Sequence, residues 1–197
     1  MKTKYKKYGK ELIKEIVSNP TESLPGGLPY LLFGGGKVST QSLYIKVGKN
    51  FEKWFKFIAK DSGMEILPDG VIENVIGGKS KDIDLIFMDK RHKVIYYREL
   101  KSNLDLDTEK LPATYEKITK ISKYLQNEYE GYEINSSLLT WAAYESTILP
   151  SRYKSKVRKC NENNVNVSYP SDFFKLLSVE ISEKDYYSFF KELGKMV

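Results

Sequence analysis

The residues best suited to chemistry lie in one segment, DIDLIFMDKRHKVIYYRELKSN, which runs from Asp82 to Asn103. Two apolar runs, each typical of a buried strand, flank a polar turn at Lys90 to Lys93. If that turn is a four-residue loop, Asp84 faces Glu99 on the neighbouring strand, with side chains roughly 5 Å apart. Lys101 shares a sheet face with Glu99, because side chains alternate with a period of two. The pattern predicts three converging charges at the end of a hairpin away from its turn.

Two carboxylates at this distance repel each other unless a positive group lies between them. A hard divalent cation favours oxygen ligands, and Mg²⁺ takes one or two protein carboxylates with waters and a substrate phosphate. A neighbouring lysine can hold or help to deprotonate an attacking water, or neutralise charge that develops on a phosphorane. Asp84, Glu99 and Lys101 therefore predict a metal-dependent site for phosphoryl chemistry. A slip of the strands by two residues would put Asp82 in the place of Asp84.

The alternative is a hairpin whose charges only pair with one another and hold the fold. Stability separates the two interpretations. In a catalytic site, we expect Glu99→Ala to leave the stability of the metal-free protein equal or slightly raised, because the carboxylates repel. In a structural hairpin, removing one partner of a buried ion pair typically costs about 3–5 kcal/mol.

The order of predicted elements around the hairpin indicates a mixed α/β sheet flanked by helices. The hairpin strands are predicted to be central, since both are apolar on both faces. An amphipathic helix is predicted over 5–18 and a Pro- and Gly-rich loop over 19–37. The other elements are a helix from Leu43 or Gly48 to Asp61, a strand pair or bent strand over 64–76, a helix over 107–129, a strand over 136–145, a basic helix or helical loop over 151–164, a short strand over 165–170 and a closing helix over 183–196.

Composition limits the classes of protein to consider. The 197 residues are 41% apolar, which is enough for one compact domain. No apolar run is long enough to span a membrane. The single cysteine, Cys160, excludes an internal disulfide and favours a reducing cytoplasm, and the single histidine, His92, is predicted to be a solvated turn residue. A formal charge of +6 permits a nucleic-acid backbone as partner.

Asp84, fifteen positions before the run Glu99-Leu100-Lys101, resembles the motif of the PD-(D/E)XK nuclease superfamily. The resemblance implies a restriction-endonuclease-like core and Mg²⁺-dependent phosphodiester hydrolysis, with Mn²⁺ able to substitute. It also implies that Asp84 and Glu99 bind the metal, that the Leu100 carbonyl adds a ligand, and that Lys101 is catalytic. The sequence departs from the motif at its proline, since Ile83 precedes the aspartate.

The resemblance extends to residues outside the motif. In many members a glutamate on the helix before the hairpin approaches the metal cluster, and Glu52 is that candidate here; the alternative is a solvated glutamate on an amphipathic helix. Lysines before the motif and polar residues after it can hold phosphates, and the segment SRYKSKVRK places five cations within nine residues. The DNA-contact candidates are Lys79, Lys81, Ser102, Asn103, Lys110, Lys117, Arg152, Tyr153, Lys154, Lys156 and Arg158.

Within the superfamily, the layout is most similar to a type II restriction endonuclease. That likeness implies a homodimer, a short and palindromic site in double-stranded DNA, and a cognate DNA methyltransferase in the same system. We expect one endonuclease domain over 1–197, with its catalytic core at about 43–145 and DNA-contact and closing elements over 146–197. The alternatives are a structure-specific nuclease, such as a junction resolvase or repair enzyme, and a basic nucleic-acid-binding module without catalysis.

Overall fold

The computed structural model describes residues 1–18, 40–68, 70–72, 81–102, 104, 110–148 and 151–196. For residues 40–42, 70–72, 81, 148 and 152 it describes the backbone alone. The chain forms two compact units, one of Met1–Trp54 with Ser182–Val197 and one of Phe55–Ile181. The hairpin lies in the second unit. That residues 1–197 form one endonuclease domain stays a prediction.

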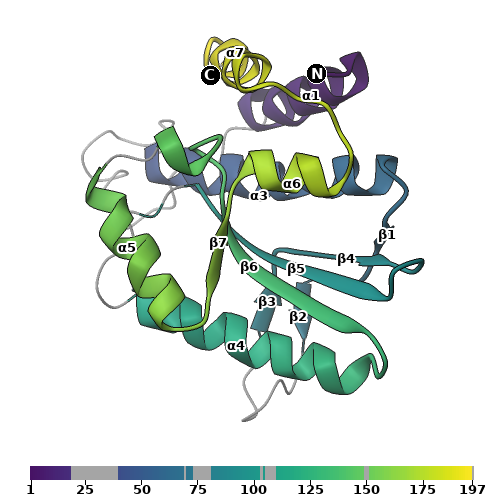
Figure 1. Ribbon diagram of the computed structural model, residues 1–197. Helices are drawn as coiled ribbons and strands as arrows, with labels where there is room; N and C mark the ends of the chain where they lie inside the picture. The colour runs from purple at the N-terminus through teal and green to yellow at the C-terminus, as the bar shows by residue number, and fades with distance from the viewer. Residues whose placement is uncertain are drawn as a thin grey trace, which may run out of the picture. The chain divides into compact units, whose positions relative to one another are not determined.

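A mixed five-stranded sheet forms the centre of the unit Phe55–Ile181 (Figure 1). Its strand order is β1-β4-β5-β6-β7; the first three strands pair antiparallel, and β5, β6 and β7 pair parallel. Two further strands form a separate antiparallel pair. The predicted α/β class with a mixed sheet is therefore confirmed. The strands are β1 (Glu65–Ile66), β2 (Gly70–Ile72), β3 (Lys81–Ile83), β4 (Leu85–Asp89), β5 (Val94–Lys101), β6 (Glu133–Thr140) and β7 (Asn166–Ser168).

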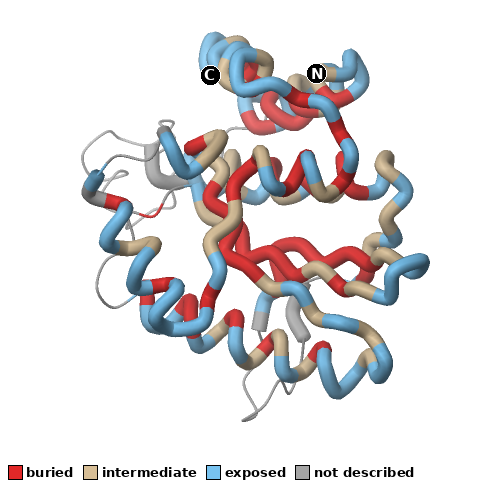
Figure 2. The backbone as a smooth tube through the Cα atoms, viewed as in Figure 1, coloured by how far each residue is buried: buried red, intermediate tan, exposed pale blue. Residues whose placement is uncertain are grey.

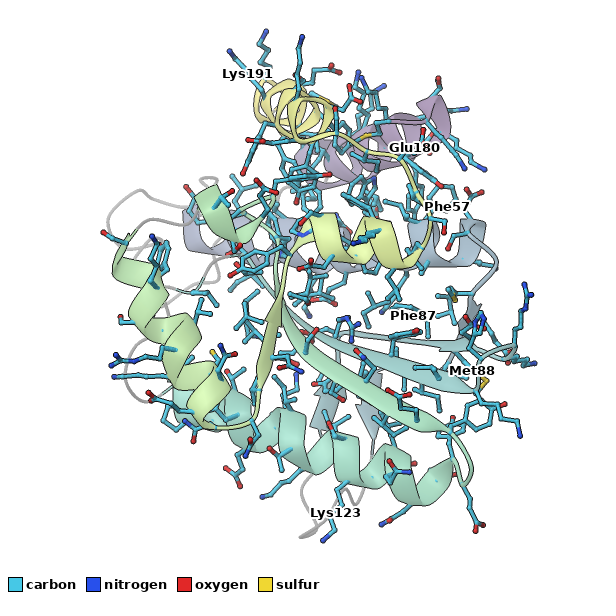
Figure 3. All side chains as sticks on the ribbon, in the orientation of Figure 1. Phe57, Phe87, Met88, Lys123, Glu180 and Lys191 are labelled. Carbon is cyan, nitrogen blue, oxygen red and sulfur yellow. The ribbon has the colours of Figure 1, made fainter. Side chains whose placement is uncertain are left out.

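The central strands bury side chains on both faces of the sheet. This explains why their sequences are continuous apolar runs and do not alternate between apolar and polar residues. Phe87 and Met88 are consecutive residues of β4 that belong to opposite faces (Figure 3). Phe87 meets Phe173 at 5.9 Å between ring centroids, whereas Met88 belongs to a different core cluster. Figure 2 shows that these strands are the most continuously buried part of the unit.

One face of the sheet is covered by α4 (Lys110–Glu128) and α5 (Ser151–Glu162). The helical periodicity of this segment predicts a buried stripe made of Leu111, Tyr115, Ile118, Leu125 and Tyr129. The first four are buried in α4, whereas Tyr129 lies just beyond the helix and is half-buried. Pro112 falls in the first turn, where its missing N–H costs no intrahelical hydrogen bond.

The opposite face is covered by α6 (Pro170–Leu176) and by residues 55–61 at the end of α3 (Thr40–Asp61). Phe55 meets Phe173 edge to face with ring centroids 5.1 Å apart. The helix α6 was not predicted from the sequence as a separate element. Its start follows Tyr169, whose backbone N–H donates to Asp172 at 2.9 Å, and Pro170 occupies the first helical position.

The other unit is helical and aromatic. It contains α1 (Thr3–Ser18), the first part of α3 and α7 (Glu183–Gly194). Trp54 is fully buried, stacks on Phe189 with centroids 5.5 Å apart, and donates from Nε1 to the Tyr5 carbonyl at 3.0 Å. Gly9 permits this packing, because a Cβ there would collide with the Phe189 ring. Within the described residues, no helix is both long and apolar enough to cross a membrane.

Among the boundaries that differ from the predictions are those of two strands. The strand predicted over 136–145 is β6, which begins at Glu133 and ends at Thr140, and a short 3-10 turn follows at Ser146–Ile148. The apolar run that begins at Asp82 is divided by a bend at Asp84, so that its first residues pair in β3 and the rest form β4. This bend decides which aspartate faces the neighbouring strand.

Candidate active site

The predicted register of the hairpin is confirmed. β4 and β5 pair from Asp89 opposite Val94 to Leu85 opposite Arg98, with Lys90–Lys93 as the turn. Asp84 immediately precedes β4. Its side chain therefore reaches the end of the hairpin that lies away from the turn.

Asp84, Glu99 and Lys101 come together at this end. Asp84 Oδ2 accepts a hydrogen bond from the backbone N–H of Leu100 at 2.8 Å. Lys101 Nζ lies 2.7 Å from Glu99 Oε1 and 4.0 Å from Asp84 Oδ2. Asp84 is 8% exposed and Glu99 is 1% exposed, so these are buried charges that require partners.

A fourth charge reaches the same place from α4. Lys117 Nζ lies 2.6 Å from Glu99 Oε2 and 3.6 Å from Asp84 Oδ1. From the sequence, Lys117 is predicted to contact DNA and not to belong to the carboxylate cluster. One signal was available: Lys117 precedes Ile121 and Leu125 at spacings of four residues, which places a lysine in line with the buried stripe of the helix. We call Asp84, Glu99, Lys101 and Lys117 the charge quartet.

Tyr97 fixes the orientation of Glu99. Its ring is fully buried on β5, two residues before Glu99 and on the same sheet face, and its hydroxyl donates to Glu99 Oε2 at 2.9 Å. Burial, together with the negative charge of Glu99, raises the pKa of the Tyr97 hydroxyl far above its ordinary value, so it remains a donor. No role for Tyr97 is predicted from the sequence, in which it stands as one of several apolar strand residues.

The two carboxylates differ in their ease of ionisation. Burial and the neighbouring charge of Glu99 raise the pKa of Asp84 above its ordinary value. Burial also opposes ionisation of Glu99, but Lys101 and Lys117 together outweigh it and hold the pKa of Glu99 below its ordinary value. Glu99 is therefore the more firmly anionic of the pair.

The donor set suits a hard divalent cation. Both carboxylates direct oxygens at one shared positive group, the Lys117 ammonium, and carboxylate oxygens are the ligands that such a cation favours. In the part of the chain that the structure describes, no three acidic, histidine or cysteine side chains lie close enough together to bind one metal ion. A metal here would use two carboxylates and further oxygen ligands, for which the Leu100 carbonyl remains the predicted protein source.

The other site candidates lie in different places. Asp82 is exposed and pairs with Val71 in the β2–β3 ladder, so the geometry joins Asp84, and not Asp82, to Glu99. Glu52 is half-buried on α3 in the unit that contains α1 and α7, and its role stays a prediction. Ser102 is exposed directly after β5, and Lys110 is exposed at the start of α4. Lys79 and Asn103 lie outside the described residues, as do the side chains of Lys81 and Arg152.

The basic segment over 151–159 forms α5, as predicted. Lys154 and Arg158 are exposed, and Lys156 lies 5.9 Å from the centre of the Tyr153 ring. Tyr153 itself is 7% exposed and belongs to the core beneath the helix. A buried ring has little surface to offer DNA, so this structure does not support Tyr153 as a contact, whereas the exposed cations remain candidates.

The chain is similar to known proteins both in structure and in sequence. Two solved structures resemble the chain weakly: an XisH family protein from Nostoc punctiforme (17% identity, TM-score 0.40, 59% of this chain and 87% of that chain) and Can2 from Sulfobacillus thermosulfidooxidans, solved with cyclic tetra-adenylate (16%, 0.43, 89% and 50%). The chain thus spans about half of the Can2 chain. No curated protein sequence matches the chain.

A family model described as "Type II restriction endonuclease, HinfI" matches residues 70–194, which include the whole charge quartet. Because that match covers more than half of the sequence, the chain belongs to the HinfI family of type II restriction endonucleases and carries a nuclease domain of the PD-(D/E)XK type.

Proposed function

We propose that this protein is a Mg²⁺-dependent type II restriction endonuclease that cuts double-stranded DNA at a specific short, palindromic sequence, with Mn²⁺ able to substitute. The observation that carries the proposal is the convergence of Asp84, Glu99 and Lys101 at one end of the β4–β5 hairpin, inside the segment that matches the family. Family membership supports nuclease activity. The metal, the sequence specificity and the residues in their roles are what we propose.

Each residue of the site has a chemical task in this proposal. Asp84 and Glu99, with the Leu100 carbonyl, would hold the cation, which when bound polarises the phosphodiester and favours an attacking hydroxide at neutral pH. Lys101 is anchored 2.7 Å from Glu99, which points its ammonium at the space beside the carboxylates. There it can orient the attacking water and neutralise charge that develops on the phosphate. Tyr97 keeps Glu99 in place through its hydrogen bond.

The DNA contacts are proposed on charge and exposure. α5 offers Lys154, Lys156 and Arg158, of which the first and last are exposed. Ser102 directly follows Lys101 at the end of β5, and Lys110 begins α4. The proposed set is completed by Lys79, Lys81, Asn103 and Arg152. Cations of this kind bind the phosphate backbone without reading sequence, so they account for affinity and not for the choice of site.

The assembly is also a proposal. A palindromic site has two-fold symmetry, which a homodimer matches by placing one active site on each strand. A sequence-specific nuclease would cut its own host, so we also propose a cognate DNA methyltransferase in the same system and a cytoplasmic location beside the genome.

The decisive experiment is digestion of unmodified phage DNA by the purified protein. We expect discrete bands with Mg²⁺ or Mn²⁺, no cleavage in EDTA, and binding without cleavage in Ca²⁺. The Glu99→Gln variant, purified in parallel, controls for a contaminating nuclease and should not cut. Preferred cutting of branched over linear DNA would instead indicate a structure-specific nuclease. Binding without cleavage under all metal conditions would indicate a non-catalytic module and overturn the proposal.

A further inference from the structure

Lys117 occupies the position between the two carboxylates of the charge quartet. Its ammonium is 2.6 Å from Glu99 Oε2 and 3.6 Å from Asp84 Oδ1. We propose that Lys117 is an internal counter-cation, which keeps Asp84 and Glu99 together in the metal-free protein and competes with the divalent cation for the same two carboxylates. This inference rests on the proposed metal-dependent function and concerns how the metal enters its site.

The two carboxylates need such a group. Both are almost completely buried, and like charges so close together in a poorly solvated place are strongly unfavourable. Lys101 compensates them unequally, since it is 2.7 Å from Glu99 but 4.0 Å from Asp84. Lys117 is also nearer to Glu99, but at 3.6 Å it approaches Asp84 more closely than Lys101 does, and it gives the quartet two positive and two negative groups.

The oxygens that Lys117 contacts are the second oxygens of each carboxylate. Leu100 N–H binds Asp84 Oδ2 and Lys101 binds Glu99 Oε1, whereas Lys117 is directed at Oδ1 of Asp84 and Oε2 of Glu99. The backbone and a side chain of β5 thus hold Asp84 Oδ2 and Glu99 Oε1. Lys117 bridges Asp84 Oδ1 and Glu99 Oε2, and the second of these oxygens also accepts a hydrogen bond from the Tyr97 hydroxyl at 2.9 Å.

Lys117 reaches the carboxylates from an element outside the hairpin. Leu100 and Lys101 belong to β5 itself, whereas Lys117 extends from α4 on a flexible four-carbon stem. Its side chain is 18% exposed, against 31% for Lys101. An ammonium and a divalent cation need the same oxygen lone pairs and repel each other. Binding of one therefore weakens binding of the other.

The competing interpretation is a permanent ion pair that only holds α4 against the hairpin. The two interpretations predict opposite effects of Lys117→Met on metal affinity. A competitor, once removed, leaves the carboxylates more available to a cation, whereas loss of a permanent brace loosens the site and weakens binding.

Calorimetric titration of Ca²⁺ into the full-length protein measures this difference without cleavage. We expect Lys117→Met to bind Ca²⁺ roughly tenfold more tightly or better than the wild type, because a positive charge in contact with both ligands is gone. Lys120→Met is the matched control: it removes the same charge from the same helix, one turn away, where Lys120 pairs with exposed Glu116. It should bind Ca²⁺ like the wild type. Equal or weaker binding by Lys117→Met would overturn the inference.

Thermal melting provides the second measurement. In EDTA, Lys117→Met should melt below the wild type, and saturating Ca²⁺ should remove most of that difference by supplying the lost positive charge. A deficit that persists in Ca²⁺ would mean a permanent brace. Lys117→Arg, which keeps the charge, should melt near the wild type in EDTA and bind Ca²⁺ no more tightly; tighter binding by this variant would also overturn the inference.

Failure of the proposed function gives a different result. If the wild type binds no Ca²⁺ and Asp84→Asn changes nothing in the titration, these carboxylates are not a metal site, and the proposed function falls together with the inference. If the wild type binds Ca²⁺ through Asp84 but Lys117→Met does not tighten it, the inference alone falls.

Discussion

The two ends of the β4–β5 hairpin both place carboxylates beside basic groups, but they do so by different means. At the turn, Asp89 accepts hydrogen bonds from the backbone N–H groups of Arg91 and His92 at 3.0 and 3.1 Å. His92 Nδ1 lies 2.7 Å from Asp89 Oδ2, and the His92 side chain is 65% exposed. At the other end, Asp84 and Glu99 are buried and depend on a lysine of α4 for part of their compensation.

The comparison separates charge pairing that is local from charge pairing that needs the tertiary fold. The hydrogen bond from His92, within three residues, holds the pKa of Asp89 below its ordinary value, so ionisation there is favourable in itself. Burial raises the pKa of Asp84, so ionisation there depends on what the fold brings near. Two carboxylates buried side by side are not needed to close a hairpin. They are expected at a site that binds a cation, which is where Asp84 and Glu99 lie in the proposed function.

Substitutions at the two ends should differ most in cleavage. We expect Asp84→Asn, Glu99→Gln and Lys101→Met each to lower the cleavage rate by about 10³-fold or more. The two carboxylates would hold the proposed cation, and Lys101 would neutralise charge that develops on the phosphate. Asp89→Ala and His92→Ala should cut like the wild type. The measurement is the rate of cleavage of a supercoiled plasmid at saturating protein, with circular dichroism to confirm folding. A loss of cleavage for His92→Ala as large as that for Glu99→Gln would contradict the prediction that only the buried end of the hairpin takes part in cleavage.

Stability of the metal-free protein should show the next largest difference. From the sequence alone, Glu99→Ala in a catalytic site was expected to leave stability equal or slightly raised. The charge quartet changes that expectation, because the substitution leaves Lys101, Lys117 and the Tyr97 hydroxyl without their shared acceptor. We now expect a loss of about 3 kcal/mol in the free energy of unfolding.

Asp89→Ala is the matched variant and should lose under about 1 kcal/mol, as exposed pairs do. Urea denaturation of both variants in EDTA provides the measurement. Equal losses at the two ends would mean that the buried partners contribute no more than the exposed ones, and the distinction between the ends would disappear.

DNA binding should depend on α5 and only weakly on the hairpin turn. We expect a triple alanine variant of Lys154, Lys156 and Arg158 to lower affinity in Ca²⁺ and to reduce the slope of log affinity against log salt by about 2 to 3. A triple alanine variant of Lys90, Arg91 and Lys93 removes the same number of charges at the turn and should change both quantities less. Fluorescence anisotropy over a salt series measures both, and equal effects of the two variants would remove α5 as the contact surface.

The smallest expected effect concerns acid. Because the pKa of Asp89 is lower in the folded than in the unfolded chain, its contribution to stability is present above the unfolded pKa near 3.9 and is lost as the pH falls through the folded value. The stability difference between the wild type and Asp89→Ala should therefore be seen at pH 6 and should disappear as the pH falls through the folded pKa of Asp89. Urea denaturation at several pH values checks this, and a difference independent of pH would show that the Asp89 charge has no part in it.

Much of the hairpin could be predicted from the sequence by itself. A four-residue turn and the period of two were enough to place Asp84 opposite Glu99 and to put Lys101 on the same face, because both rules act over a few residues. The buried stripe of α4 was predicted for the same reason, since its period of 3.6 is local. The fold class followed from the order of these elements.

Tertiary structure alone decided three features. The bend at Asp84 depends on the separate pairing of β3 with β2, and it excludes Asp82 from the cluster. The short helix α6 has an apolar face that is stabilised by Phe55 and Phe87, which are distant in sequence. Lys117 is eighteen residues beyond Glu99, so its contact with the carboxylates is set by how α4 docks on the sheet. Helical periodicity indicates that a lysine faces inward but not which charges it meets, because that distance is fixed by packing between elements and not within them.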